Sequence, residues 1–283
     1  MRYIDLHVHS NCSDGTFSPE ELVVLGIKQE LVAFALTDHD TISGVERAIK
    51  KAEEFDNKIQ VIPGMELSCK YLLSSSQSVE IHMLGYRYDI HNKKLIATLE
   101  DISNERDERN RKMCSNLQNA GFPISYDMLC ERFGDTILTR AHFARLLLEN
   151  GGVPSLDYAF RTCLSSDSPY FVNREYLTPK DAIDLIRASG GIPVLAHPLL
   201  YKLSVSQIRR LLDDLTSYGL CGIEAIYSRN RGTDEAFVRK LADEYHLFIT
   251  GGSDFHGANK PDIELGRGTG NLRVPVMLLE NLR

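Results

Sequence analysis

The sequence predicts an α/β fold in which repeated strand–helix units form a closed or nearly closed parallel barrel. Three observations carry this prediction. Seven short apolar segments have the pattern of buried strands, capped helical segments lie between them, and one interval of about ninety residues lacks strand character. The chain of 283 residues, 43% hydrophobic and 25% charged, is long enough for one large domain with an insert.

The predicted strands are nearly continuous apolar runs, as strands buried on both faces of a parallel sheet require. Clear examples are the segments IQVIPG, IPVLAH and LFITGG. The three serines at 74–76 predict a short flexible loop after the third strand. The seven strands are predicted at 3–8, 32–37, 59–65, 79–86, 192–197, 222–227 and 247–253.

Helix start and stop signals occupy the intervals between these strands. Ser18 is a predicted N-cap, followed by proline at the first helical position and glutamate at the third. Thr178 caps a later helix that Gly190 ends. The predicted helices run over 18–30, from Thr41 or Ser43 to 55, and over 178–191, 204–219 and 232–246.

The interval 87–176 interrupts the strand–helix rhythm. We predict a helical subdomain here, with helices over 95–121, 124–134 and 140–152, inserted between the fourth and fifth strands. The barrel then comprises residues 1–86 and 177–283. Long insertions at the carboxyl rim of a barrel often shape a substrate site, so we expect the insert to cap the active site. The alternative is a stabilising flap without substrate contact.

Histidine and acidic residues gather where the predicted strands end. Imidazole and carboxylate are the usual protein ligands of zinc, manganese and iron, and strand ends on one rim of a barrel bring distant residues together. Each cluster alone is a weak signal, but together they predict a metallohydrolase. The clusters contain His7, His9 and Asp14; Asp38 and His39; Glu66; His82; His197; and Asp254 and His256.

The composition argues against several other classes of protein. The net charge of −7 argues against a broad basic surface for duplex nucleic acid, although cations lining a pocket can still bind an anionic substrate. The six cysteines show no C-x-x-C pairing and are expected to be reduced, and Cys12 is not counted as a ligand. With no apolar run long enough for a membrane helix and no room for a signal peptide before His7, we expect a soluble cytoplasmic protein.

Three histidines, His91, His142 and His246, lie outside these clusters. His91 and His246 are expected to be solvated or packed. Arg140 and His142 fall at the start of a predicted helix, where arginine and the helix N-terminus both suit a phosphate group. A solvated helix face is the equally weighted alternative.

The motifs resemble those of the PHP (polymerase and histidinol phosphatase) superfamily of metal-dependent phosphoesterases. The resemblance covers the barrel from end to end through D-L-H-V-H-S, S-D-G, L-T-D-H-D-T-I-S-G, G-M-E, I-H-M-L-G-Y, A-H-P and G-S-D-F-H. It implies a distorted (β/α)7 barrel and a site for two or three divalent ions. Manganese is the metal favoured by the resemblance, with iron and zinc as alternatives.

The resemblance also implies a ligand set. His7, His9, Glu66 and Asp254 would surround the first metal. Glu66 would bridge to a second metal held by His82 and His197, and Asp14, His39 and His256 would hold a third. Asp38 and Asp40 do not match ligands and are expected to orient His39 and its neighbours.

The insert motifs T-R-A-H-F-A-R and Y-F-V-N-R resemble one branch of the superfamily, the bacterial 3′,5′-nucleoside bisphosphate phosphatases and related 5′-to-3′ exoribonucleases. The prediction is therefore a phosphatase that removes the 3′-phosphate of a substrate such as 3′-phosphoadenosine 5′-phosphate, by attack of a metal-bridging hydroxide. His39, Glu66, Asp254 and His256 would be catalytic. Arg140, His142 and Arg174 would bind the second phosphate.

Several alternatives stay open at this point. A 5′-to-3′ exoribonuclease acting on short 5′-phosphorylated RNA uses the same site. Histidinol-phosphatase-type and amidohydrolase-type activities use a similar barrel, although no lysine lies in the ligand clusters to serve as a carboxylated bridge. A non-catalytic nucleic-acid-binding module is disfavoured by the complete ligand set. The expected partners are a small phosphorylated nucleotide or short RNA, without duplex DNA, a membrane or an obligate protein partner.

Overall fold

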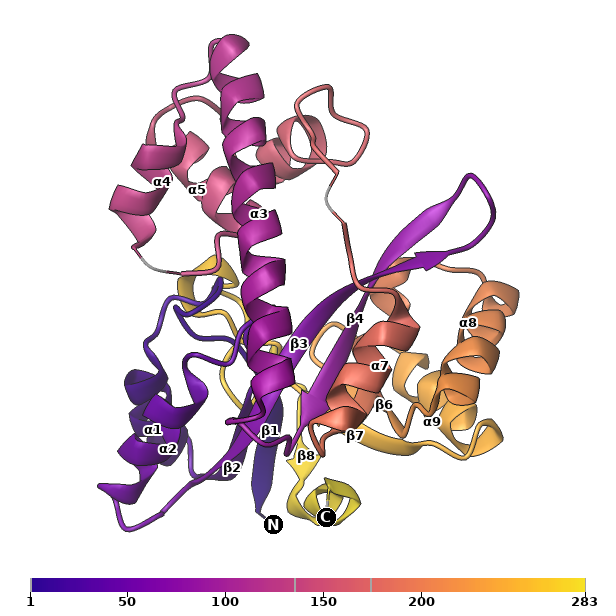
Figure 1. The fold of residues 1–283 in the computed structure, drawn as a ribbon. Coiled ribbons are helices and arrows are strands. Elements are labelled where there is room, and N and C mark those ends of the chain that lie inside the picture. Colours follow the sequence, from indigo (N-terminus) through magenta and orange to yellow (C-terminus); the bar gives the residue numbers. More distant parts are fainter. Residues whose placement is uncertain (1, 135, 174, 283) are drawn as a thin grey trace.

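The strands form one sheet that curls into a nearly closed barrel (Figure 1). The fold is that of a computed structural model, which describes residues 2–134, 136–173 and 175–282. Within this part of the chain the sheet has eight strands in the order β7-β6-β5-β4-β3-β2-β1-β8. The strands are β1 (Tyr3–Val8), β2 (Leu31–Leu36), β3 (Gln60–Leu72), β4 (Ser78–Tyr86), β5 (Ile192–Leu195), β6 (Gly222–Tyr227), β7 (Phe248–Gly252) and β8 (Val274–Pro275).

All seven predicted strands are confirmed, and the α/β barrel with them. The largest difference in length is β3, which continues to Leu72, beyond the predicted end at residue 65. The sequence did not reveal β8, which pairs antiparallel with β1 through Val274 opposite Ile4. A strand of two residues that includes proline has too few positions to show a strand pattern.

The prediction of a wholly parallel barrel is wrong at β4, which runs antiparallel to both β3 and β5. The physical reason is the short connection between β3 and β4. Only residues 73–77 join the two strands, and Leu73 N donates to Gln77 O at 2.8 Å within this loop. A parallel neighbour needs a crossover of a dozen or more residues, so a connection of this length forces a hairpin. The hairpin extends well beyond the barrel (Figure 1).

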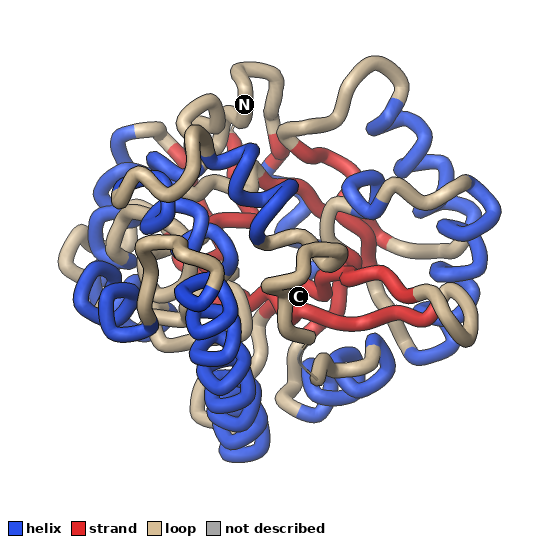
Figure 2. Tube along the Cα trace, turned by 90° about the horizontal axis from the view of Figure 1, so that it is seen from above, coloured by secondary structure: helices blue, strands red, loops and turns tan. Residues whose placement is uncertain are grey.

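Helices lie around the strands when the molecule is seen from above (Figure 2). The predicted caps are confirmed at Ser18, which accepts from Glu21 N, and at Thr178, which accepts from Asp181 N. The second helix begins later than predicted, with Gly44 as its N-cap, because residues 41–44 form a turn closed by Val45 N donating to Ile42 O. The barrel helices are α1 (Pro19–Lys28), α2 (Val45–Glu53), α7 (Pro179–Ala188), α8 (Val205–Tyr218) and α9 (Asp234–Glu244).

The barrel interior is apolar below the strand ends. Ile4, Leu6, Ala35, Tyr86 and Val194 are buried in one cluster there. Burial of this apolar surface fixes the strand positions, so the polar residues that follow the strands are carried to a common rim.

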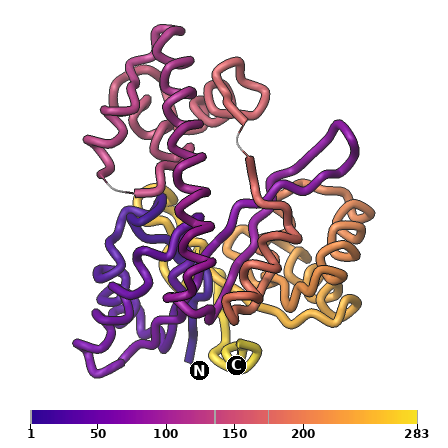
Figure 3. Tube along the Cα trace, in the orientation of Figure 1, coloured from indigo at the N-terminus to yellow at the C-terminus, as the bar shows by residue number. Residues whose placement is uncertain are grey.

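The predicted helical insert is present between β4 and β5 (Figure 3). Leu117, Leu129, Phe143 and Leu147 belong to a hydrophobic cluster of the insert itself. Leu95, near the start of α3, packs instead in the cluster beneath the barrel helices, so α3 connects the two parts. The division of the chain into domains at residues 87 and 176 stays a prediction. The insert helices are α3 (Lys93–Asn119), α4 (Tyr126–Phe133), α5 (Arg140–Glu149) and α6 (Leu156–Tyr158), followed by the π-helical segment Ala159–Cys163.

Across the described residues, no helix combines the length and the apolar character needed to cross a bilayer.

Candidate metal centre

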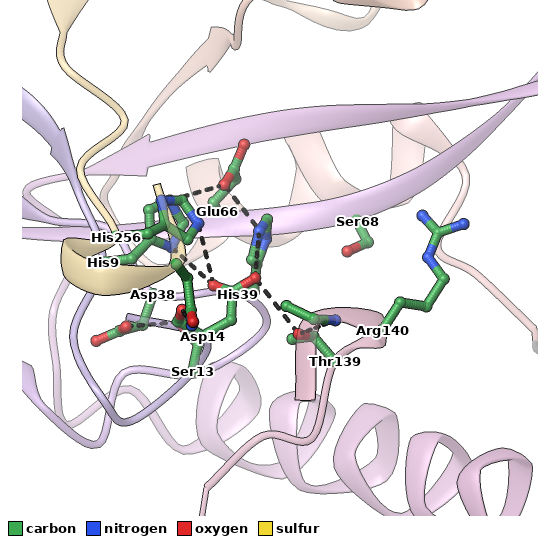
Figure 4. A network of polar contacts seen from close by, with 12 residues as sticks. His9, Ser13, Asp14, Asp38, His39, Glu66, Ser68, Thr139, Arg140 and His256 are labelled. Atoms are coloured by element: carbon green, nitrogen blue, oxygen red, sulfur yellow. Dashed lines mark hydrogen bonds and ion pairs between the residues drawn. The ribbon is translucent and has the colours of Figure 1, made fainter. Parts of the chain in front are cut away.

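The predicted metal ligands lie together at one rim of the barrel, below the insert. Those from β1, β2, β5 and β7 lie at or soon after the strand ends, as predicted. The prediction is wrong for Glu66 and His82, which lie in the middle of β3 and β4, because the β3–β4 hairpin continues past the rim. Figure 4 shows His9, His39, His256, Asp14 and Glu66 gathered in this region, with Arg140 apart from them on the side of Ser68. The residues that converge are therefore separated by most of the chain in sequence but by a few ångströms in space.

Glu66 is the centre of the cluster. Its side chain is only 1% exposed, and its two oxygens each face a different set of imidazoles. Both carboxylate oxygens can therefore serve as ligands at once, as a bridging role requires. Oε2 lies 3.2 Å from His7 Nε2, 3.2 Å from His9 Nε2 and 3.2 Å from His39 Nδ1, and Oε1 lies 2.9 Å from His82 Nδ1 and 2.9 Å from His197 Nε2.

Asp14 and Asp254 complete the cluster on the opposite side. Asp14 Oδ1 lies 3.2 Å from His256 Nε2, and Asp14 Oδ2 lies 3.9 Å from His39 Nε2. Asp254 Oδ1 lies 3.3 Å from His256 Nδ1 and 3.5 Å from His9 Nε2. Asp14 and Asp254 therefore both face His256. Asp14 also faces His39, and Asp254 also faces His9, and these two imidazoles contact Glu66 as well.

Ligand atoms within 4.8 Å of one another form three overlapping groups among the described residues. Three groups agree with the expectation of two or three ions. The residues within each group differ from those of the predicted assignment. His39 stands with Glu66 and His82, where the resemblance implies His197, and His9 joins the third group. The groups are His7, His9 and Glu66; His39, Glu66 and His82; and His9, Asp14, His39 and His256.

The cluster contains buried polar atoms that form no hydrogen bond with any described residue. An unsatisfied buried nitrogen or oxygen is costly, and several of them pointing into one space indicate a missing partner. Cations at this position would supply partners for the two carboxylate oxygens and for one nitrogen of each imidazole, and an imidazole and carboxylate set without thiolate suits manganese, iron or zinc. The donor set therefore fits a cluster of divalent ions. The atoms are His7 Nε2, His9 Nδ1 and Nε2, Asp14 Oδ1, His39 Nδ1, Glu66 Oε2 and His197 Nδ1.

Electrostatics favour the metal-binding protonation states at several of these positions. Burial opposes ionisation of Glu66, but His39, His7 and His82 together hold its pKa well below the ordinary value. Burial, assisted by neighbouring His256, holds the pKa of His9 well below the ordinary value. Ionised carboxylate and neutral imidazole are the forms that bind metal ions.

Asp38 and Asp40, on either side of His39, connect this segment to its neighbours by hydrogen bonds. Asp38 accepts hydrogen bonds from Ser10 N at 2.8 Å and from Ser13 Oγ at 2.6 Å, which fixes the loop leading to Asp14. Asp40 accepts from Ser68 N at 2.8 Å. Asp38 thus holds the loop that follows β1, and Asp40 holds the residues after β2 against strand β3.

Glu224 and Asp5 were missed by the sequence analysis. Glu224, on β6, lies with Oε1 3.0 Å from His7 Nδ1 and accepts from His197 N at 2.8 Å through Oε2. Asp5, on β1, accepts from Ser253 N at 2.8 Å next to Asp254. The signal was present, because each is an acidic residue within a largely apolar strand. Both are at most 1% exposed in the structure.

The three predicted substrate-binding residues have different outcomes. Arg140 lines the cavity above the cluster. His142 does not line it; its Nδ1 accepts from Thr139 N at 2.9 Å and caps α5, and burial lowers its pKa to about 4. We propose a structural role for His142 instead, because its buried ring caps α5 and does not line the cavity. Arg174 lies outside the described residues.

The cavity over the cluster has a volume of about 260 Å³. Asp14, His39, His82 and His256 lie on the metal side of it. The cationic side chains that line it are Arg106, Arg109, Arg140 and Lys260. A lining that combines candidate metal ligands with four cationic side chains suits an anionic substrate held against bound cations.

The family model of the PHP domain matches residues 5–152, more than half of the chain. The chain belongs to the PHP domain family. It is accordingly a hydrolase, a metal-dependent phosphoesterase of the PHP family.

Similar proteins agree with this assignment. The chain is 34% identical over 252 residues to a 5′-3′ exoribonuclease of Haemophilus influenzae, covering 89% of each protein. It is 32% identical over 269 residues to a 3′,5′-nucleoside bisphosphate phosphatase of Chromobacterium violaceum, covering 94% of this chain and 91% of that protein. A solved structure from Bifidobacterium adolescentis, named a metal-dependent phosphoesterase, superposes with a TM-score of 0.85 and 27% identity over 99% of this chain and 95% of that one.

Replacing Glu224 with glutamine tests its role in positioning the metal ligands. We expect Glu224→Gln to weaken metal binding about 10- to 100-fold, because His7 loses the carboxylate that fixes its ring and its tautomer. Metal affinity is measured by titrating metal-free protein and following ion binding calorimetrically. Glu235→Gln, on exposed α9, is the matched control, and equal affinities in the two variants would remove Glu224 from this role.

Proposed function

We propose that the protein hydrolyses the 3′-phosphate of a 3′,5′-nucleoside bisphosphate such as 3′-phosphoadenosine 5′-phosphate. The observation that carries the proposal is that one cavity adjoins the three ligand groups and is also lined by three arginines. We call these arginines, Arg106, Arg109 and Arg140, the cationic wall. One phosphate would lie at the ligand cluster, and the other would lie against the arginines of the insert. The relative from Chromobacterium violaceum bears the name of this activity.

Divalent ions bound by the cluster would supply an activated water and neutralise charge on the phosphoryl oxygens. We propose His7, His9, Asp14, His39, Glu66, His82, His197, Asp254 and His256 as the residues that hold them. Lys260 Nζ donates to Asp254 Oδ2 at 2.6 Å, and Tyr227 Oη donates to the same oxygen at 2.7 Å. These two donors leave Asp254 Oδ1 directed at His9 and His256, so they fix the orientation of the carboxylate.

The cationic wall would select substrates with a second phosphate. Arg140 begins α5, and its Nη2 lies 3.2 Å from Glu80 Oε2 at the edge of the cavity. Arg106 and Arg109 are buried on α3 and line the same cavity. A 5′-phosphate bound here would leave the sugar 3′ side facing the ligand cluster.

Arg140→Ala should separate substrates with two phosphates from those with one. We expect kcat/KM for 3′-phosphoadenosine 5′-phosphate to fall about 10- to 100-fold, because a charge-assisted hydrogen bond contributes about 1.5–3 kcal/mol. For adenosine 3′-phosphate, the same variant should change kcat/KM by less than about threefold. Steady-state phosphate release measures both. Equal losses on the two substrates would exclude Arg140 from recognition of the second phosphate.

Release of inorganic phosphate from 3′-phosphoadenosine 5′-phosphate, with manganese, iron or zinc added in turn to metal-free protein, tests the proposal directly. Histidinol phosphate and a panel of amides and lactones serve as comparison substrates. Faster turnover of any comparison substrate than of the bisphosphate would contradict the proposal.

A second candidate is a 5′-to-3′ exoribonuclease acting on short 5′-phosphorylated RNA. The relative from Haemophilus influenzae bears the name of this activity. The two candidates use the same chemistry, because each breaks the bond between phosphorus and the 3′ oxygen of the first nucleoside. They differ only in whether the scissile phosphate carries a further nucleotide.

A further inference from the structure

The insert contacts the metal centre directly, through the residues that lead into α5. These residues donate hydrogen bonds to the loop that follows β1, and the last of the bonds reaches the side chain of Asp14, a predicted metal ligand. The insert therefore holds the loop that carries this ligand. The three bonds run from Thr136 Oγ1 to Ser13 O at 2.9 Å, from Ile137 N to Cys12 O at 3.1 Å and from Thr139 Oγ1 to Asp14 Oδ2 at 3.4 Å.

The proton of the Thr139 hydroxyl is directed to Asp14. Thr139 is the N-cap of α5, and its hydroxyl oxygen accepts from Ala141 N at 3.2 Å. His142 Nδ1 lies 3.4 Å from the same oxygen, but this nitrogen already accepts from Thr139 N at 2.9 Å. The carboxylate of Asp14 is the stronger acceptor of the two, so the hydroxyl donates to Asp14. Figure 4 marks this contact with a dashed line.

The two oxygens of Asp14 have different surroundings. Oδ2 accepts from Thr139, whereas Oδ1 is buried and forms no hydrogen bond with any described residue. Oδ1 lies 3.2 Å from His256 Nε2 and 3.7 Å from His9 Nδ1. The hydroxyl thus fixes one oxygen and leaves the other directed at imidazoles. Asp254 has the same arrangement, with its donors on Oδ2 and its Oδ1 facing imidazoles.

The packing of the insert fixes the position of Thr139. Thr139 is 7% exposed, and the neighbouring Leu138 is buried in the hydrophobic cluster of the insert. Asn110, fully buried on α3, donates from Nδ2 to Leu138 O at 3.0 Å. A hydroxyl held by packing and hydrogen bonds in this way can define the orientation of the carboxylate that it contacts.

A second line of contacts runs from α5 to the same ligand. Arg145 Nη1 donates to Asn259 Oδ1 at 3.3 Å, and Asn259 Nδ2 donates to the backbone carbonyl of Asp14 at 2.7 Å. Asn259 lies shortly after His256, whose ring faces Asp14. One helix of the insert therefore supports Asp14 through its side chain and through its main chain.

We propose that Thr139 is a positioning residue for the divalent ion of the third ligand group, so that the insert completes the metal centre as well as covering it. The inference rests on the metal set of the proposed function but not on the proposed substrate. Thr139 would act through Asp14, by holding its carboxylate in the orientation that the ion requires. Loss of such an outer partner of a ligand weakens metal binding about 10- to 100-fold. The members of the third ligand group are His9, Asp14, His39 and His256.

The effect should be confined to one ion. Of the three ligand groups found among the described residues, Asp14 belongs to one, and Glu66 belongs to the other two. Thr139→Val keeps nearly the shape of the side chain and removes the hydroxyl. This variant should therefore weaken one class of bound ion and leave the others in place.

The test is a titration of the metal-free full chain with Mn²⁺, in which electron paramagnetic resonance of free Mn²⁺ reports how much ion is bound. For Thr139→Val we expect one class of site to bind about 10- to 100-fold more weakly and the other classes to stay within about twofold. Thr139→Ser, which keeps the hydroxyl, should bind as the unaltered protein does. Thr178→Val is the matched control, because it removes the exposed N-cap of α7, outside the cavity lining, and should also bind normally.

A double variant identifies the site that is weakened. Asp14→Ala removes the carboxylate that Thr139 contacts, and three imidazoles of the group remain. Thr139→Val added to Asp14→Ala should therefore cause no further loss of Mn²⁺ binding. Losses that add in the double variant would show that Thr139 does not act through Asp14 and would overturn the proposal.

The remaining outcomes separate this inference from the proposed function. Equal Mn²⁺ binding by Thr139→Val and the unaltered protein, or equal weakening of every class of site, would overturn the positioning role. Weakening by Thr139→Ser as large as that by Thr139→Val would also overturn it. An unaltered protein that binds no Mn²⁺ would overturn the metal set and the proposed function with it. The expected Mn²⁺ titrations without hydrolysis of 3′-phosphoadenosine 5′-phosphate would support Thr139 in this role and overturn the proposed substrate alone.

Discussion

Glu66→Gln is expected to reduce phosphoesterase turnover by about a thousandfold or more. Glu66 faces five imidazoles through two oxygens, and the substitution keeps the shape of the side chain while removing its charge. A carboxylate that bridges two ions cannot be replaced by an amide, which offers one neutral oxygen. Loss of the several kcal/mol of charge stabilisation that bound ions provide corresponds to this rate change.

The measurement is phosphate release from 3′-phosphoadenosine 5′-phosphate, together with the metal content of the purified protein. His39→Ala and Asp254→Asn should show comparable losses, because each removes another predicted ligand. Glu53→Gln, at the exposed end of α2, is the matched control, and its turnover should equal that of the unaltered protein. Near-normal turnover of Glu66→Gln in protein verified to contain metal would refute a bridging role for Glu66.

The barrel and its ligand cluster could be predicted because both follow from local sequence patterns. Continuous apolar runs specify buried strands, and a run that ends in T-D-H-D or S-D-F-H has no packing reason to do so. Once the parallel strands are arranged in a barrel, their carboxyl ends must meet at one rim. His7 and Asp254 are therefore brought to 3.8 Å although they lie at opposite ends of the chain.

The features that were missed depend on contacts that no local pattern encodes. The antiparallel direction of β4 was missed because the third strand was predicted to end at residue 65, which left thirteen residues before residue 79, enough for a crossover. The connection has only five residues because β3 continues to Leu72. The role of His142 depends on its ring turning back to Thr139 N, which sequence cannot show. Glu224 could have been found, because a glutamate within the apolar strand G-I-E-A-I-Y needs a buried partner.

Arg106→Met is expected to lower the free energy of unfolding by about 3–5 kcal/mol, since it removes one partner of a buried ion pair. The guanidinium of Arg106, on α3, contacts Asp40 Oδ2, and the two side chains are 7% and 1% exposed. Asp40 would keep its hydrogen bonds from Ser68 but would lose the guanidinium of Arg106 from beside its buried charge. Methionine retains most of the apolar stem of arginine, so lost packing contributes little. Urea denaturation of metal-free protein measures the change.

The double variant Asp40→Asn with Arg106→Met separates the buried charge from every other effect of the substitution. Asparagine can still accept from Ser68 N through its amide oxygen, and no unpaired carboxylate remains. Most of the lost stability should therefore return, because replacing both partners of a buried pair costs far less than removing one. A single variant within about 1 kcal/mol of the unaltered protein, or a double variant no more stable than the single one, would show that this ion pair does not hold α3 on the barrel.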